Sequence, residues 1–435
     1  MKNTKWFLII AGLLFLLVLF NLYYSMRSSK TQLDPNDRTR ENVQEKHERV
    51  KDQAERQRMK AYLTEYRKDQ VILKTIVGPS GDTIDFIDLY SQRALKKHKI
   101  SREQVELRPK TAPAATKNDS GSVVRDYFKG NMLYELTGET CPAGAIPIRR
   151  LNMETLTRFE TLEDFFRKSH GRIEPPCGSD GGSAGTHEYA HASRSVGNWG
   201  AESIMNVWDP YVEQADEFSL SQMWVVRGSG GDRETVEAGW QAYRDLYGDW
   251  GPHLFIYFTP DNYGDGGGYN LESGDFVQVN NTVYITGGFT HHSSNGGDQW
   301  EFKLMLYKDG TNGAWWLKYG DTWVGYWPRS LFDANGLRDQ GSIVDFGGEI
   351  VNTQTDGRHT RTDMGSGHWP SEGFGHAAYQ RNVQYIDTNN FYQRATSLNA
   401  SRTNRNCYDI NLVESSGSWQ VFFFFGGSGF NTSCP

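Results

Sequence analysis

Two glutamates stand out because of the segments that hold them. Glu237 lies in VEAGWQ at 236–241 and Glu349 in VDFGGEIVN at 344–352, and both segments have the glycine-marked apolar pattern of strands. Burying a carboxylate is costly unless it shares a proton or gains partners. Two carboxylates held close together split their pKa values, so that one acts as a base and the other as an acid. The pair therefore suggests acid–base chemistry, while hydrogen bonding of each glutamate to the sheet backbone explains the pattern equally well.

Two glutamines and several aromatic residues near these segments are candidate contacts for a substrate. On an extended strand Glu237 and Gln241 share one face and Trp240 lies on the other, because side chains alternate. The polarity of Gln222 and Gln241 suggests that one of them holds a developing oxyanion. The candidate aromatic contacts are Trp240, Tyr326 and Trp327, within a larger set that adds Trp315, Trp316, Trp323 and Trp369. These rings either line a groove or form the core, which is the commoner position for any one of them.

The segment HEYAH at 187–191 matches the HExxH pattern of zinc peptidases. In that pattern two histidines on one face of a helix bind zinc and the glutamate acts as base. Here the segment directly follows a Gly/Ser-rich stretch, and its alternating histidines suit a strand equally well. No third ligand is marked out, although Glu202, Glu213 and Glu217 are candidates. We expect a strand edge with two solvent-facing histidines, with no metal and no cofactor.

The chain beyond residue 186 has the pattern of an all-β protein. Apolar residues alternate with period two, and turn signals recur at intervals of roughly ten residues. The predicted strands are 218–226, 254–259, 276–285, 301–307, 314–319, 343–346 and 419–425, with turns at 280–281 and 309–313. Long helical periods are absent. We therefore predict that residues 187–435 form an antiparallel β-sandwich.

The residues before this β unit have a different pattern. Residues 177–186 are rich in glycine and serine, which predicts a flexible linker. Two strands around a turn at 78–82, followed by a helix at 155–168, predict a small α+β domain at 71–176. Residues 27–70 are densely charged and predict a helical stalk.

The first 26 residues predict an export segment. Residues 6–24 are nearly all apolar and follow two lysines, and the run is long enough to cross a bilayer as a helix. No A-x-A-like cleavage pattern follows it, so we favour a retained signal anchor over a cleaved signal peptide. We expect an extracytoplasmic protein, secreted or anchored to the membrane by this helix.

The charge of the chain is unevenly distributed. Its formal net charge of −7 combines a net +8 in residues 1–176, from 31 basic and 23 acidic residues, with a net −15 in the rest, from 15 and 30. A uniformly basic nucleic-acid binder is excluded, and four cysteines are too few for a disulfide-built scaffold. The asymmetry suggests that the basic part covers the acidic part as an inhibitor, and that protonation of carboxylates in acid weakens this contact.

Many ordered motifs occur from about residue 71 onward. Those of the first domain are KTI at 74–76, GDTID at 81–85, KHKI at 97–100 and CPAGAIPIRR at 141–150. Those of the β unit are HEYA at 187–190, NVW at 206–208, EFSLSQMW at 217–224, EAGWQ at 237–241, LYGD at 246–249, VGYWP at 324–328, GGE at 347–349, MGSGH at 364–368 and EGF at 372–374. Together these motifs resemble the neprosin family of glutamic prolyl endopeptidases. The resemblance implies a propeptide domain at 71–176 before a catalytic β-sandwich.

The resemblance also implies a chemistry. The family's two catalytic glutamates correspond to Glu237 and Glu349, which activate water without a metal or a covalent intermediate, with activity greatest in acid and cleavage after proline. The expected partners are a proline-containing peptide and the intramolecular propeptide. Cys407 and Cys434 match cysteines of some members and are expected to pair. The partner of Cys141 stays open, and Cys177 is one possibility.

Two other functions fit a carboxylate pair and many aromatic residues on a β-sandwich. A glycoside hydrolase or a carbohydrate-binding module has these features. A non-catalytic surface adhesin would keep the fold and the aromatics but tolerate glutamine at both glutamates.

Overall fold

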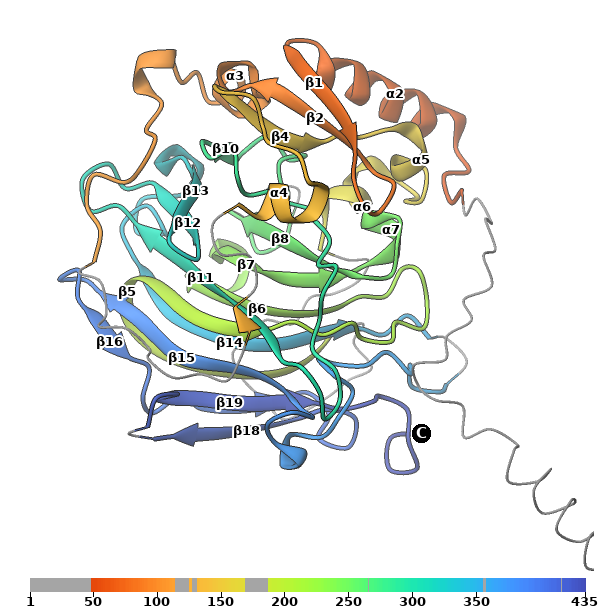
Figure 1. The fold of residues 1–435 in the computed structure, drawn as a ribbon, viewed down its shortest axis with the longest axis vertical. Coiled ribbons are helices and arrows are strands. Elements are labelled where there is room, and N and C mark those ends of the chain that lie inside the picture. Colours follow the sequence, from red (N-terminus) through yellow and green to blue (C-terminus); the bar gives the residue numbers. More distant parts are fainter. Residues whose placement is uncertain are drawn as a thin grey trace, which may run out of the picture. The chain divides into compact units, whose positions relative to one another are not determined.

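The computed structural model describes residues 48–113, 125–126, 131–168, 187–264, 266–354, 357–415 and 417–435 (Figure 1). Glu48–Pro435 form one compact unit. The predicted membrane span, the start of the stalk and the linker at 177–186 lie outside the described residues. Among the helices that are described, none has the length and apolar character needed to span a bilayer. We call 48–168 the N-terminal region and 187–435 the C-terminal region.

The N-terminal region is a small α+β structure, as predicted. A β-hairpin turns through Gly81, whose positive φ of 79° suits glycine, and its second strand pairs with a third to give the antiparallel order β1-β2-β4. The side chain of Asp52 accepts a hydrogen bond from the Ala54 N–H and caps the first described helix. The elements are α2 (Gln53–Arg67), β1 (Ile72–Val77), β2 (Thr83–Asp88), α3 (Arg93–Lys97), β3 (Arg125–Asp126), α4 (Met132–Thr137), β4 (Ala145–Arg149), α5 (Met153–Leu156) and α6 (Leu162–Phe166).

The C-terminal region is mostly β, with strands joined in the main order β10-β13-β12-β11-β5-β14-β6-β7-β8-β9. The pairs are antiparallel, apart from a short parallel pairing of β3 with β11. The elements are β5 (His187–Asn206), β6 (Ser219–Arg227), β7 (Glu234–Ala242), α7 (Arg244–Tyr247), β8 (Pro252–Thr259), β9 (Gly268–Tyr269), β10 (Val277–Gln278), β11 (Trp300–Lys308), β12 (Trp315–Tyr319), β13 (Thr322–Trp327), β14 (Gly341–Val351), β15 (Ala378–Asp387), β16 (Tyr392–Arg394), β17 (Asn399–Arg402), β18 (Asp409–Glu414) and β19 (Val421–Gly426).

The long strand β5 holds the sheet together. Its first half pairs with β14 and β17, and its second half pairs with β11 and β15. At Gly200, where the β11 pairing begins, φ is +144° and a Cβ would collide with the backbone carbonyl of Leu306. Only glycine allows this approach. The antiparallel β prediction is therefore confirmed, while the two sheets expected of a sandwich are joined into one curled hydrogen-bonded network.

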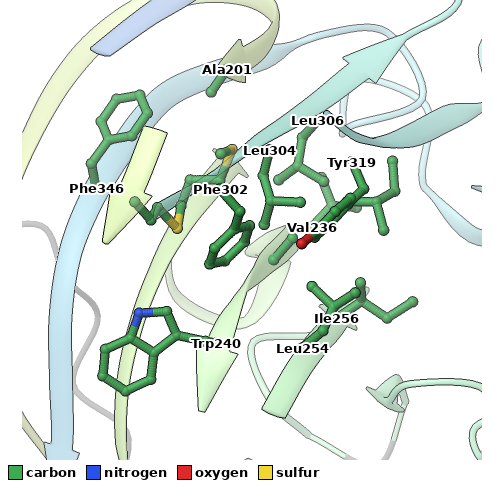
Figure 2. Packing of buried hydrophobic residues seen from close by; sticks show 14 of the residues in the cluster. Ala201, Val236, Trp240, Leu254, Ile256, Phe302, Leu304, Leu306, Tyr319 and Phe346 are labelled. Atoms are coloured by element: carbon green, nitrogen blue, oxygen red, sulfur yellow. The ribbon is translucent and has the colours of Figure 1, made fainter. Parts of the chain in front are cut away.

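The main core fills the inside of the curl. Figure 2 shows Val236 and Trp240 of β7 and Ile256 of β8 packed toward Phe302 and Leu304 of β11. These side chains are almost completely buried. The opposite face of β7, which carries Glu237, therefore lies outside this core.

Two predicted elements differ in the structure. The helix predicted at 155–168 is two short helices, α5 and α6, because Thr161 starts a new helix through a capping box with Asp164. The strand predicted at 276–285 is reduced to β10, because the Asn280 side chain accepts hydrogen bonds from the N–H groups of Thr282 and Val283 and forms a turn. The other predicted strands correspond to β6, β8, β11, β12, β14 and β19.

Candidate active site

Strands β7, β6 and β14 bring the two predicted glutamates to one face of the sheet. Gln222 of β6 lies opposite Gly239 of β7 and opposite Gly347 of β14. Directly opposed residues share a face, and so do residues two apart on a strand. Glu237 and Glu349, each two residues from one of these glycines, therefore project from the same face, on either side of β6. A Cβ at Gly239 would lie 2.7 Å from the Cα of Gln222, so this close packing requires glycine.

A lysine from the N-terminal region lies between the two glutamates. Lys168 Nζ is 2.6 Å from Glu237 Oε2 and 2.8 Å from Glu349 Oε2, and the lysine side chain is 1% exposed. The ammonium group also lies 5.3 Å from the ring centroid of Trp224. Burial lowers the pKa of Lys168, but the charges of the two glutamates outweigh burial and raise it above its ordinary value. A charged lysine thus neutralises and covers the carboxylate pair.

Glu349 is surrounded by nitrogen groups. His187 Nδ1 lies 2.6 Å from Glu349 Oε1, and Gln222 Nε2 donates to Glu349 Oε2 at 3.0 Å. Burial raises the pKa of Glu349, but the Lys168 charge and the contact with His187 outweigh burial and hold it below its ordinary value. These neighbours favour the ionised form of Glu349.

Glu237 is surrounded by hydroxyl groups instead. Its Oε1 accepts from Thr235 Oγ1 at 2.8 Å and from the Tyr263 hydroxyl at 2.7 Å. Burial and the charge of Glu237 raise the pKa of Tyr263 well above its ordinary value, so this phenol keeps its proton. A hydroxyl can donate or accept, so these two partners suit either protonation state of Glu237.

The HEYAH segment forms the start of β5, and its histidines are not solvent-facing. His187 contacts Glu349, and His191 Nδ1 lies 2.8 Å from Asp345 Oδ1. Both are buried, because this half of β5 is an interior strand between β14 and β17 rather than a strand edge. Glu188 projects to the other face and contacts His359 Nε2 at 2.6 Å. The histidines and the glutamate are therefore not combined as in a zinc peptidase.

Of the other predicted contacts, only Gln222 reaches the pair. Gln241 Nε2 donates to the Tyr269 hydroxyl at 3.0 Å. Trp240 and Trp327 lie in the main core, and Tyr326 packs in a separate apolar cluster with Trp316. Trp240 is three residues from Glu237 and so faces the other way. The tryptophan beside the pair is Trp224, which lies opposite Glu237 in the β6–β7 register.

The cysteines are partly described. Cys407 and Cys434 form a disulfide. Cys141 is a free, half-buried thiol whose pKa is raised by burial to about 12, and Cys177 lies outside the described residues. Where the chain is described, one group of possible metal ligands occurs, His359 with Cys407 and Cys434. Both sulfurs of that group are in the disulfide and are not available as thiolates.

The N-terminal region is attached to the C-terminal region by further ion pairs and by a shared apolar cluster. In each of these pairs the basic residue comes from the N-terminal region. They are Arg49 with Asp216 and Asp245, Lys97 and His98 with Asp275, and Arg149 with Glu272. The apolar cluster joins Met59, Leu63, Leu156, Phe159 and Phe165 to Phe218, Leu220, Tyr243, Phe255 and Tyr257.

Replacing Arg149 by methionine is expected to lower the free energy of unfolding at neutral pH by about 3–5 kcal/mol, because it leaves a buried carboxylate without its cation. Arg149 and Glu272 are both buried, and the guanidinium donates to Glu272 Oε1 at 2.7 Å and 3.1 Å and to the Leu246 carbonyl at 2.7 Å. Urea unfolding followed by fluorescence measures the change. Arg58→Met is the control, since it removes a more exposed pair with Glu163 inside the N-terminal region. Equal losses in both variants would contradict a special role for Arg149.

Sequence reasoning missed several residues of this site, among them Trp224. Thr235 had a usable signal, because it stands two residues before Glu237 on the same strand face. For Lys168, the only signal in the sequence was the excess of basic residues in the first 176 residues. Tyr263 and Tyr269 follow β8 in a glycine-rich stretch, and no local pattern relates them to a glutamate.

Comparison with known proteins gives two family matches. The family model for Neprosin matches residues 215–428, and that for Neprosin activation peptide matches residues 75–193. A crystal structure of scytalido-glutamic peptidase with a transition state analog inhibitor is similar with a TM-score of 0.32 and 8% identity, covering 55% of this chain and 98% of that one. SCP-B, a member of the Eqolisin family of peptidases in a complex with a tripeptide, has a TM-score of 0.30 and 8% identity, covering 56% and 98%. Structural similarity at this level assigns no residue a role.

Proposed function

Because the chain belongs to the neprosin family, we propose that it is a glutamic endopeptidase that works through Glu237 and Glu349 and is made as a zymogen. The observation that carries this proposal is the position of Lys168, whose ammonium group contacts both carboxylates at once. An inhibitory propeptide is expected to block the atoms that perform the reaction, and Lys168 does this for both carboxylates of the proposed pair. The intramolecular partner is the N-terminal region, and the substrate is a peptide.

The surroundings of the two glutamates suggest different roles once Lys168 has left. With one proton shared by the pair, Glu349, next to His187 and Gln222, is the ionised partner that takes a proton from water as the water attacks the scissile carbonyl carbon. Glu237, held by two hydroxyls, carries the proton and donates a hydrogen bond to the carbonyl oxygen as negative charge develops there. A carboxyl of the pair then protonates the leaving nitrogen, and the peptide is released as two shorter peptides.

Gln222 supports this arrangement from the centre. Its Nε2 holds Glu349, while its Oε1 is buried and has no hydrogen-bond partner among the described residues. A buried acceptor without a partner is costly. The N–H of a bound peptide would satisfy it, which orients the scissile bond between the two carboxylates.

The family resemblance supports cleavage after proline, and paired peptides test it. We expect the full chain in acid to cleave a proline-containing peptide at least about tenfold faster than the same peptide with alanine in place of proline, and EDTA should leave the rate unchanged. About 1.4 kcal/mol of differential binding between the two peptides is enough for this tenfold preference. The measurement is kcat/KM by mass spectrometry of the products. Equal rates on both peptides would remove the proline specificity, and loss of activity in EDTA would restore a metal mechanism.

Inhibition by the N-terminal region is supported by its charge and its contacts. The ion pairs between the two regions place basic groups of the N-terminal region on carboxylates of the C-terminal region, as the split into +8 and −15 predicts. Protonation of these carboxylates in acid weakens each contact. We therefore propose that acid promotes the release of the active site.

The nearly continuous apolar run at residues 6–24 supports an extracytoplasmic location, either secreted or anchored by that segment. The N-terminal residue of the active species distinguishes the two. A terminus beyond residue 168 would show that activation separates the enzyme from both the anchor and the N-terminal region.

A further inference from the structure

Lys168 is held by its backbone as well as by its side chain. The hydroxyl of Tyr269 donates to the Lys168 carbonyl oxygen at 3.3 Å. Burial raises the pKa of Tyr257, and the nearby Lys168 backbone opposes that rise. Both phenols therefore lie next to the backbone of this lysine.

The two tyrosines form a compact pair beside the active site. Tyr257 of β8 and Tyr269 of β9 are directly opposed in the sheet, and their ring centroids are 4.8 Å apart. Tyr257 is also directly opposed to Glu237 of β7. Glu237, Tyr257 and Tyr269 are therefore neighbours in one row across β7, β8 and β9. Both are about 1% exposed. The Tyr269 hydroxyl donates to the Lys168 carbonyl oxygen, and the Tyr257 ring packs beside it.

A relay of polar groups fixes the direction of the Tyr269 hydroxyl. Tyr247 donates to Gln241 Oε1 at 3.3 Å, and Gln241 Nε2 donates to the Tyr269 oxygen at 3.0 Å. Because the Tyr269 oxygen already accepts from Gln241, its own proton points to the Lys168 carbonyl. Tyr269 therefore binds a backbone atom, which every peptide has, and this contact does not depend on the lysine side chain.

We propose that Tyr257 and Tyr269, oriented by Gln241, form a subsite that binds the backbone of the peptide substrate, and that Lys168 occupies this subsite as a stand-in for one substrate residue. This inference rests on the proposed function. An extended lysine side chain reaches about 6 Å from Cα to Nζ, and an extended peptide advances about 3.3–3.6 Å per residue. The subsite therefore binds the residue about two positions from the scissile bond.

A length series of peptides tests the subsite. The full chain is brought to constant activity in acid and given peptides extended one residue at a time on each side of the cleaved bond. We expect kcat/KM of the wild-type protein to rise about three- to tenfold when the residue two positions away is added, the gain typical of a net hydrogen bond. Tyr269→Phe and Tyr257→Phe are expected to lose this step while still cleaving the shortest peptide.

Control variants and substrates separate this subsite from a structural effect. Tyr243→Phe removes a phenolic oxygen from the same apolar cluster and should keep the step. An ester in place of the amide whose carbonyl lies in the subsite is a weaker hydrogen-bond acceptor, so it should lower kcat/KM for the wild-type protein and leave Tyr269→Phe unaffected. A step that persists in both tyrosine variants, or an ester without effect, overturns the subsite. If instead Glu237→Gln and Glu349→Gln keep full activity, the proposed function fails, whatever the length series shows.

Discussion

Replacing Glu237 or Glu349 by glutamine is expected to lower kcat/KM on a proline-containing peptide by about 10²–10⁴-fold, the usual contribution of a general acid or base. Glutamine keeps the shape and most hydrogen bonds of glutamate but neither accepts a proton from water nor donates one to a leaving group. Both carboxylates contact the same Lys168 nitrogen, so they lie within reach of one peptide bond. The measurement is the rate of peptide cleavage in acid with EDTA present.

The pH profile of the residual activity separates the two roles. A base must be ionised and an acid must be protonated, so Glu349→Gln should remove the acid limb of the profile and Glu237→Gln the alkaline limb. Glu202→Gln is the matched control, because Glu202 is also a buried glutamate in the sheet but contacts Gln384 and Tyr392 away from the site. Undiminished cleavage by either dyad variant would rule out the glutamate mechanism, and a loss in all three variants would indicate a general effect on folding.

Replacing Lys168 by methionine is expected to give the full chain measurable peptidase activity at higher pH than the wild type. The direction of this pH shift follows from the pKa of Glu349. Its pKa is lowered in the closed state, so the contact with Lys168 is fully present above the ordinary value of 4.5 and is lost as the pH falls below it. The raised pKa of Lys168 contributes at every pH below its ordinary value of 10.5 and so does not open the site in acid.

The wild-type chain should therefore become active only below roughly pH 4.5. In Lys168→Met the carboxylates have no cation, so they share a proton at higher pH and the closed state is weaker by at least about tenfold, the equivalent of one charge-assisted hydrogen bond. Initial rates after a pH jump, with gels to show that the chain is intact, measure this. Lys74→Met is the matched control, since Lys74 pairs with Glu139 inside the N-terminal region. Identical pH thresholds for wild type and Lys168→Met would show that Lys168 does not keep the active site closed.

The sequence could predict those parts of the fold and site that depend on short-range patterns. Period-two alternation located most strands, and the resemblance together with the glycine-marked strands indicated Glu237 and Glu349. The same alternation places Trp240 on the core side of β7, which explains why it is absent from the site. Local chemistry that competes with periodicity was missed, as at Thr161, where a capping box divides the predicted helix.

Contacts between distant segments could not be predicted in the same way. Lys168 is separated from Glu237 by 69 residues, and nothing in its neighbourhood indicates a partner. His187 looked like a surface residue because the pairing of β5 with both β14 and β17 depends on the whole topology. The sequence therefore indicated the two glutamates, while only the structure showed which side chains contact them.

The apolar cluster between the two regions has a consequence for the time after activation. On the proposed function, the N-terminal region of a continuous chain would be a tethered competitor at high effective concentration, which a substrate would have to displace from the same tyrosines. A cut between residues 168 and 187 would turn this into an encounter between two separate molecules. Inhibition would then depend on dilution, so a freshly cut enzyme would gain activity as its former N-terminal region diffuses away.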